Sequence, residues 1–339
     1  MNPELAKKVA DAVLYEGYML YPYRPSAIKN RQRWTCGILY PPAYGEVQRG
    51  TERAEMRSEC LVTASGDARV HIQLRCLHLL ARQVARAVED RFEPVSSLVV
   101  DGQLVETWDE GVERSVEFEV ALQDRLTRRF EFSFPGFSEA EELRESGGQI
   151  VGKITRMQHE LHGRMTIASQ RVRKSVWKLL INVSNSTELP VETVDRDQAL
   201  LQSLLSAHTS LTVSGGEFVS LLDPPDDLRD LVSECKNVGN FPVLVGNEGE
   251  CDMMLCSPIV LYDYPQIAPE SAGDFYDATE MDEMLTLRVM TLTDDEKTEM
   301  GRADAHARNL LERTEESARE QLARTHGAIR SMRPVSEKR

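Results

Sequence analysis

The sequence lacks an excess of positive charge, and it lacks any long hydrophobic run. Among its 339 residues 55 are acidic and 40 are basic, which gives a formal net charge of −15. Nucleic acids and anionic membranes are bound by broad positive faces, so this balance disfavours both as partners. No stretch approaches the apolar length that a membrane-spanning helix needs, and the N-terminus lacks the apolar block of a signal peptide. We therefore expect a soluble cytoplasmic protein without membrane insertion and without a nucleic-acid partner.

Common catalytic and cofactor-binding motifs are also missing. The sequence contains no Walker motif, no GxGxxG and no GxSxG, so we expect no cofactor, although a triad assembled in space from distant residues stays open. His159 and His162 are three residues apart in HELH, whereas a metalloprotease needs two histidines four apart on a helix. The cysteines form no CxxC pair and are most simply small buried apolar residues. They are Cys36, Cys60, Cys76, Cys235, Cys251 and Cys256.

Alternation of apolar and polar residues dominates the first half of the chain. It predicts strands over 57–64 and 68–77 with a tight turn at 65–67, and a hairpin around Asp101–Gly102. Many short strands with turn chemistry between them favour an antiparallel sandwich or barrel. An acidic stretch at 138–148 interrupts the series and is predicted to be a solvated loop or a short helix. One face of the second predicted strand consists of Val70, Ile72, Leu74 and Cys76.

The pattern changes after about residue 190, and the expected fold class is therefore α+β. Asp195 and Gln198 predict the cap of a helix that ends near Ala207, and Gly215–Gly216 predicts another hairpin. The predicted parts are an N-terminal helix (1–16), a β-rich antiparallel sandwich-like domain (17–190), a smaller α+β domain (191–292), a C-terminal helix (293–332) and a disordered tail (333–339).

The predicted C-terminal helix has a clear start and a thin apolar face. Thr293 and Glu296 form the pattern of a capping box, and acidic residues fill the first turn, which the helix dipole favours. The apolar stripe is rich in alanine, so the helix must dock on its own protein or on a partner to be stable. A homo-oligomer held by this helix is one arrangement that the pattern allows.

Aromatic and basic residues gather between Leu14 and Trp34, although the chain as a whole is acidic. Arginine and lysine beside aromatic rings suit an acidic or phosphorylated partner. The alternative is structural, since prolines hold the segment extended and tyrosines bury well against a β-domain. Packing explains the aromatic residues but not the clustered charge of Arg24, Lys29, Arg31 and Arg33, which we call the basic arm. The predicted partner-binding residues are the basic arm with Tyr21, Tyr23 and Trp34.

An acidic segment at 273–284, GDFYDATEMDEM, carries the opposite charge. Its carboxylates suit a hard cation such as Mg²⁺ or Ca²⁺, and Glu280 and Glu283 would share one face of a helical turn. The segment does not match an EF-hand, because the central glycine and the final glutamate are missing. A solvated surface, a partner-facing surface and a contact with the basic arm are the other interpretations. The candidate metal ligands are Asp274, Asp277, Glu280 and Glu283.

Three stretches have distinctive sequences. They are VLYEGYMLYPYRPSAIKNRQRW at 13–34, GGEFVSLLDPP at 215–225, and the run from SPIVLYDYP to DDEKTEM at 257–300. Together they resemble an uncharacterised bacterial family found in gene clusters of high-affinity uptake [NiFe] hydrogenases. That family carries no assigned activity, so no site residues follow from it. What the resemblance implies is an accessory or assembly role.

These observations predict a non-enzymatic accessory protein that binds a protein partner. The resemblance implies that the partner is a hydrogenase subunit or a maturation factor. The alternative is a divalent-metal-dependent hydrolase that uses the acidic segment 274–283. A redox or iron–sulfur centre held by the cysteines is a third hypothesis.

Overall fold

The computed structural model describes residues 2–16, 36–189, 195–266, 289, 292–303, 308–309 and 311–312. The chain divides into two compact units, residues 1–18 with 32–266 and residues 19–31 with 267–339, and each unit is described by itself. Within the described ranges, no helix is both long enough and apolar enough to cross a membrane.

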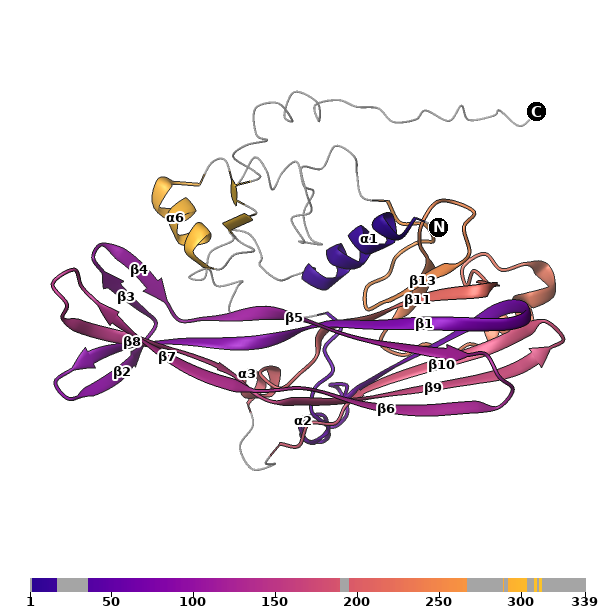
Figure 1. The fold of residues 1–339 in the computed structure, drawn as a ribbon, viewed down its shortest axis with the longest axis horizontal. Helices are drawn as coiled ribbons and strands as arrows, with labels where there is room; N and C mark the ends of the chain where they lie inside the picture. Colours follow the sequence, from indigo (N-terminus) through magenta and orange to yellow (C-terminus); the bar gives the residue numbers. More distant parts are fainter. Residues whose placement is uncertain are drawn as a thin grey trace, which may run out of the picture. The chain divides into compact units, whose positions relative to one another are not determined.

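The first unit is built from antiparallel strands, which Figure 1 labels. They are β1 (Glu55–Val88), β2 (Arg91–Val95), β3 (Ser97–Val100), β4 (Gln103–Glu106), β5 (Trp108–Ala121), β6 (Leu126–Phe134), β7 (Phe137–Arg144), β8 (Ile150–Gln158), β9 (Leu161–Arg173), β10 (Val176–Asn185), β11 (Leu205–Phe218), β12 (Phe241–Leu244) and β13 (Met253–Ser257). Eleven of these strands form one sheet with the main path β12-β13-β11-β1-β10-β9-β6. β2, β5 and β8 also pair with β1, β7 pairs with β8, and β3 forms a separate hairpin with β4.

The longest strand, β1, changes partners along its 34 residues. Residues 55–63 pair with β10, 62–77 with β11 and 69–82 with β5. The sequence predicts two strands here, joined by a tight turn at 65–67. That prediction is wrong, because both runs belong to one strand and their described pairing partners are other strands. The ribbon of β1 bends sharply at one end of the sheet (Figure 1).

The second predicted hairpin, at Gly215–Gly216, is also a bend within one strand. β11 continues through both glycines, and its register with β1 shifts between Ala64 and Arg69. Gly215 has a φ of +75°, which glycine adopts without strain. Turn-forming residues therefore face each other on two paired strands, where they bend the sheet instead of ending the strands.

One apolar core joins the two halves of β1. Cys60 and Val62 come from before the bend, Val70 and Ile72 come from after it, and the other members include residues of β6, β9, β10 and β11. The predicted inward face of the second run is confirmed. Strands from both sides of residue 190, where the sequence predicts a domain boundary, share this core and this sheet, so the described structure does not divide there.

The far end of β1 carries a smaller apolar cluster around Val84, Leu98 and Ile154. The predicted hairpin at Asp101–Gly102 is confirmed, since it joins β3 to β4 with φ angles of +47° and +76°. The loop or short helix predicted for 138–148 is wrong, because most of this stretch forms the strand β7. Its exposed glutamates suit a sheet edge, where charged side chains discourage the pairing of a further strand.

Short helices cover parts of the sheet. α1 (Pro3–Tyr15) matches the helix predicted at the N-terminus, and Asn2 caps it by accepting a hydrogen bond from the Leu5 N–H. The buried face of α1 packs on β12 and β13, and Asp11 of α1 forms an ion pair of 2.6 Å with Arg75 of β1. The other helical segments of this unit are α2 (Pro42–Val47), α3 (Arg196–Leu200), η2 (Asp226–Leu228) and α4 (Arg229–Ser233).

The cap predicted for α3 is confirmed, but its predicted length is wrong. Asp195 Oδ1 accepts a hydrogen bond from the Gln198 N–H at 2.8 Å. The helix ends at Leu200, well before Ala207, because β11 begins at Leu205 and continues the sheet.

In the second unit the described residues include the helix α6 (Asp294–Ala303). Its predicted capping box is confirmed: the Glu296 N–H donates to Thr293 Oγ1 at 3.3 Å, and the Thr293 N–H donates to Glu296 Oε2 at 3.0 Å. Most of the helix predicted beyond 303, and the tail predicted for 333–339, lie outside the described residues.

Candidate functional site

The strands β1, β10, β9 and β6 present a polar surface on the side away from the core. On β10, Trp177, Leu179 and Ile181 point into the core, so Lys178 and Leu180 between them point outward. The same alternation continues across the neighbouring strands, since β10 pairs with β1 and β9, and β9 pairs with β6. We call the surface formed by these outward side chains the outer face.

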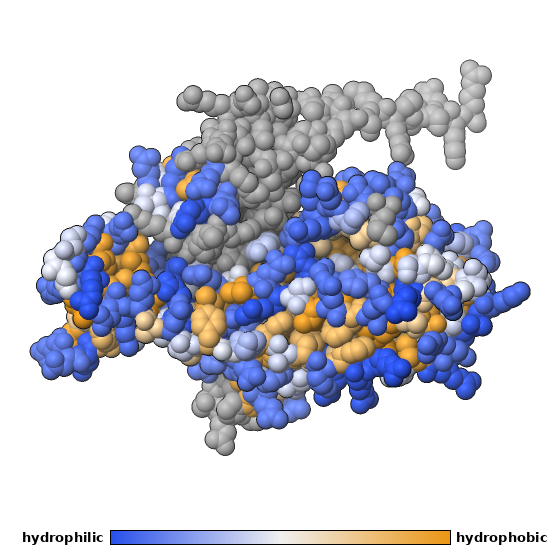
Figure 2. Space-filling view, in the orientation of Figure 1, coloured by the Kyte–Doolittle hydropathy of each residue, from blue (hydrophilic) through white to orange (hydrophobic). Residues whose placement is uncertain are grey.

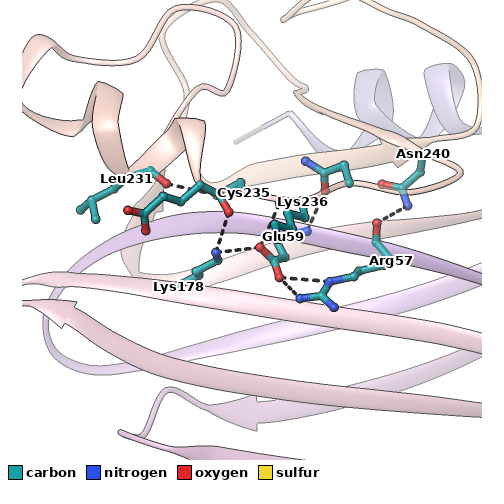
Figure 3. Close-up of polar contacts among 9 residues, drawn as sticks. Arg57, Glu59, Lys178, Leu231, Cys235, Lys236 and Asn240 are labelled. Atoms are coloured by element: carbon teal, nitrogen blue, oxygen red, sulfur yellow. Dashed lines mark hydrogen bonds and ion pairs between the residues drawn. The ribbon is translucent and has the colours of Figure 1, made fainter.

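Glu59 of β1 lies in the outer face with only 2% of its surface exposed, although glutamate is seldom buried without partners. Its carboxylate lies between Arg57 and Lys178 (Figure 3). Arg57 Nε donates to Oε1 at 3.0 Å. Lys178 Nζ lies 2.7 Å from Oε2, and the Lys236 N–H donates to the same oxygen at 2.9 Å. Both carboxylate oxygens are therefore hydrogen-bonded.

The same network fixes the segment 234–240 against the sheet. The Glu59 N–H donates to Asn237 Oδ1 at 2.7 Å, and Asn240 Nδ2 donates to the Arg57 carbonyl at 2.9 Å. Buried backbone groups that lack a strand partner need such side chains to satisfy them. Glu59 and its neighbours therefore attach a loop to the strand β1 (Figure 3).

Electrostatics keep Glu59 ionised. Burial raises the pKa of its carboxyl group, but hydrogen bonds from Lys178, from Arg57 and from the Lys236 N–H outweigh burial and lower the pKa below its ordinary value. A general acid at neutral pH needs the opposite shift. Burial also raises the pKa of the neighbouring Cys235 to about 11, so this thiol stays protonated. The cluster is thus an anchor for positive charge rather than a centre for proton transfer.

Beside this network the outer face contains a cavity of about 440 Å³. Its lining includes three cationic side chains, Arg57, Arg125 and Lys178, and one acidic side chain, Glu59. Arg125 lies in the turn between β5 and β6 with a φ of +55°. We call this site the cationic cavity.

A second cavity, of about 600 Å³, includes residues near the other end of β6. Glu131, Glu160 and Glu188 line it together with Arg164 and His162. Arg164 Nε donates to Glu131 Oε1 at 2.6 Å, and His162 Nε2 lies 3.4 Å from Glu160 Oε1. Acidic side chains predominate, so we call this site the acidic cavity.

The HELH sequence contributes two side chains, Glu160 and His162, to the acidic cavity. Its residues stand between β8 and β9 and at the start of β9, not on a helix. In the part of the chain that the structure describes, no three His, Cys, Asp or Glu side chains are grouped so as to hold a metal ion.

All the site residues predicted from the sequence lie outside the described residues. This applies to the basic arm with Tyr21, Tyr23 and Trp34, and to the metal ligands proposed between 274 and 283. Sequence reasoning missed Arg57, Glu59 and Lys178. One signal was present, since Arg57 and Glu59 alternate on one face of a strand. Lys178 lies on another strand, and only the pairing of β1 with β10 brings it to Glu59.

Within the described residues the cysteines form no disulfide. The sequence predicts burial for all six: this is confirmed for Cys60, Cys76 and Cys256 and is wrong for Cys36, Cys235 and Cys251, which are half-buried. Burial raises the pKa of Cys76 to about 12, so its thiolate is disfavoured.

Comparisons with known proteins assign no family to the chain. No family model matches it, and no curated protein matches it. Among solved structures, the Salmonella SPI-1 type III secretion injectisome secretin InvG (residues 176-end, open gate state) aligns with 71% of this chain and 67% of its own. The identity is 11% and the TM-score is 0.13, so this likeness carries no argument.

Proposed function

We propose that this chain is a non-enzymatic accessory protein with a sandwich-like β-domain, and that it binds an acidic surface of a protein partner. The observation that carries the proposal is the cationic cavity on the outer face, where Arg57, Arg125 and Lys178 surround a space of about 440 Å³. The shared core of the two halves of β1 supports the sandwich-like arrangement.

The cavity suits carboxylates for two reasons. The guanidinium group of Arg125 can hold a carboxylate through two parallel hydrogen bonds, whereas Arg57 already donates from Nε and Nη2 to Glu59 and adds positive charge beside it. Lys178 and Arg57 are also held in position by Glu59, so a partner that binds them orders few additional side chains. Complementary charge of this kind speeds association and selects partners.

We infer that the partner is a subunit or a maturation factor of an uptake [NiFe] hydrogenase. This inference rests on the resemblance carried by 13–34, 215–225 and 257–300. The basic arm stays a prediction as a second positive surface for the same partner. The divalent-metal-dependent hydrolase that would use 274–283, the cytoplasmic location and the C-terminal helix as a contact between copies also stay predictions.

The first experiment measures binding of the purified protein to purified hydrogenase subunits and maturation factors at low and moderate salt. The variant Arg125→Asn removes one charge of the cavity while keeping a residue that tolerates a positive φ. We expect it to weaken binding by about tenfold, mainly at low salt. A variant with all four residues of the basic arm replaced by serine tests the arm in the same assay.

Arg49→Asn is the matched control. Arg49 also has a φ of +55°, but it follows α2 and does not line the cavity. If both variants bind as the natural protein does, the cavity is not the binding surface. If no hydrogenase protein binds at all, the proposed partner is wrong. Deletion of the gene should then leave hydrogen uptake unchanged, whereas the proposal expects uptake to fall.

A further inference from the structure

The strand β6 has a free edge. It pairs with β9 on one side, and within the described residues no strand pairs with its other side. An edge of nine residues presents a row of unpaired backbone N–H and C=O groups, which is a template for a further strand.

The core beside this edge is incompletely covered. Phe118 of β5 and Phe130 of β6 pack with their ring centroids 4.8 Å apart, and both rings are only half-buried. Val116 and Phe132 on the same two strands are half-buried as well and pack against the main core. Figure 2 shows apolar side chains gathered along the strands between rows of hydrophilic ones. An additional strand at this edge would remove apolar surface from water.

Two other edge strands of the described sheet are protected against pairing. β12 is only four residues long and contains Pro242, which cannot donate a backbone hydrogen bond. β7 exposes Glu139, Glu141 and Glu142, so a second copy of it would oppose like charges. β6 has neither form of protection. Its exposed outward side chains are Thr127, Arg129, Glu131 and Ser133.

The order of residues on β6 is self-complementary. When two copies pair antiparallel with Phe130 opposite Phe130, Arg129 of each copy faces Glu131 of the other. On the inward side Arg128 faces Phe132, which allows a cation–π contact. Opposite charges and aromatic pairs directly across an antiparallel ladder are favourable. Within the described residues Glu131 is paired with Arg164, and its second oxygen is available for Arg129 of the other copy.

We propose that a second copy of this chain pairs with β6 in this register, so that the sheet continues through a twofold axis at Phe130. The positions of the two cavities support a second copy as the occupant. Arg125 of the cationic cavity stands at one end of β6, and Ser133 of the acidic cavity lies near the other end. Antiparallel pairing brings the cationic end of each copy to the acidic end of the other. The argument for this dimer does not rest on the proposed hydrogenase partner, but the dimer brings the second copy next to the cationic cavity that we assign to that partner.

The main test uses two charge reversals in the full-length chain, followed by sedimentation velocity over a series of concentrations. Arg129→Glu places glutamate opposite glutamate, and Glu131→Arg places arginine opposite arginine, twice in each dimer. We expect each variant to weaken the dimer by about tenfold or more.

Mixing the two variants separates charge matching from misfolding. In the mixed pair, the glutamate introduced by Arg129→Glu faces the arginine introduced by Glu131→Arg, and the natural Glu131 of the first variant faces the natural Arg129 of the second. Both contacts are therefore again opposite in sign. We expect the mixture to form dimers at concentrations where each variant alone is monomeric. A mixture that stays monomeric contradicts the register, because every mixed pair then offers charges of opposite sign at both contacts.

A disulfide tests the position of the axis. Phe130→Cys brings two cysteines face to face, at the Cα separation of about 4.5–5.5 Å that antiparallel neighbours have, which suits a disulfide. Phe132→Cys is the matched control, because it faces Arg128 and has no cysteine opposite. We expect mild oxidation to cross-link the first variant and not the second.

A control variant on the other edge completes the design. Glu141→Arg on β7 breaks an ion pair with Arg156 just as Glu131→Arg breaks one with Arg164, and it should leave the dimer unchanged. The proposal is overturned by a natural protein that stays monomeric at the highest soluble concentration. It is equally overturned by a dimer that survives both charge reversals, or by equal cross-linking of the two cysteine variants.

Discussion

Two glutamates on strands of the same sheet show how burial changes the value of an ion pair. Glu59 on β1 has 3% of its side chain exposed and is held by Arg57, Lys178 and a backbone N–H. Glu141 on β7 has 61% of its side chain exposed and contacts Arg156 at 3.0 Å. The residue types are the same, but the free energy that depends on them differs.

The difference lies in what remains when one partner is removed. Around Glu59 the Lys178 side chain is only 24% exposed and the Lys236 N–H loses its acceptor, so water replaces the lost contacts incompletely, although Arg57 is 42% exposed. Around Glu141 water solvates the arginine that is left behind, so little is lost. Position in the sheet, and not the count of ion pairs, therefore predicts which charges stabilise this protein.

The largest effect should come from Glu59→Ala. It removes the acceptor for two cationic side chains and for the Lys236 N–H, so we expect the free energy of unfolding to fall by about 3 kcal/mol. Denaturation in urea measures the change. A loss close to that of a surface substitution would show that the buried network contributes little and that the comparison is mistaken.

A second effect appears on acidification. Burial lowers the pKa of His78 to about 4, with Arg114 adding to the shift, and burial lowers the pKa of His208 to about 4. Both are neutral in the folded chain, whereas their unfolded forms take up a proton below about pH 6.5. The free energy of unfolding that depends on these two neutral histidines is therefore fully present above pH 6.5. It is lost as the pH falls from 6.5 towards 4.

Substitution separates these histidines from other titrating groups. At pH 5 each buried histidine should lower the free energy of unfolding by about 2 kcal/mol relative to pH 7. His208→Gln should remove that share of the pH dependence, measured as the difference in unfolding free energy between the two pH values. His71, whose side chain is 43% exposed and lies 3.3 Å from Glu117, is the control. An equal change of the pH dependence in His71→Gln would contradict the assignment.

A smaller loss of stability is expected at Gly163, where the Phe132 ring of the edge strand β6 packs. A Cβ on Gly163 would lie 2.1 Å from the Phe132 ring, so Gly163→Ala forces that ring to move. We expect a loss of about 1–2 kcal/mol in thermal or chemical unfolding. Gly147→Ala is the control, because nothing lies within 4 Å of its Cβ. Equal free energies of unfolding for the two variants would show that the Phe132 ring is not packed against Gly163.

The smallest effect should come from Arg156→Ala on the exposed side of the comparison. Arg156 contacts Glu139 and Glu141 at the surface, where ion pairs contribute less than about 1 kcal/mol. Urea denaturation should give a midpoint close to that of the natural protein. A loss of unfolding free energy as large as that of Glu59→Ala would show that the exposed ion pairs of β7 contribute as much as the buried network of Glu59.

Local signals in the sequence predicted local structure well. The hairpin at Asp101–Gly102 needs two residues that accept positive φ, and the caps at Asp195 and Thr293 need only neighbours three residues away. The large antiparallel β-content follows in the same way from the period-two alternation. Features of this kind depend on a few adjacent residues, so the sequence contains what decides them.

Features decided by distant pairing were not predictable in this way. Residues 65–67 and the pair Gly215–Gly216 are of types that favour turns. They lie opposite each other on paired strands, so the structure has one bend in the sheet where the sequence predicts two hairpins. The acidic residues of β7 favour a loop when the sequence is considered alone, and they form a strand because they pair with β8. The Glu59 site requires Lys178 from β10, and the register that brings it there is set by the whole core.

The course of β1 also determines the order in which the chain can fold during synthesis. Thr63 pairs with Val176, and Val70 pairs with Val213, so the partners β10 and β11 leave the ribosome long after β1, whereas β2 and β5 follow it soon. Assembly of the sheet must wait for them, and contacts of such long sequence separation slow folding. In the interval residues 55–63 of β1 lack their partner β10, and we expect chaperone binding to concentrate on nascent chains that end before β10.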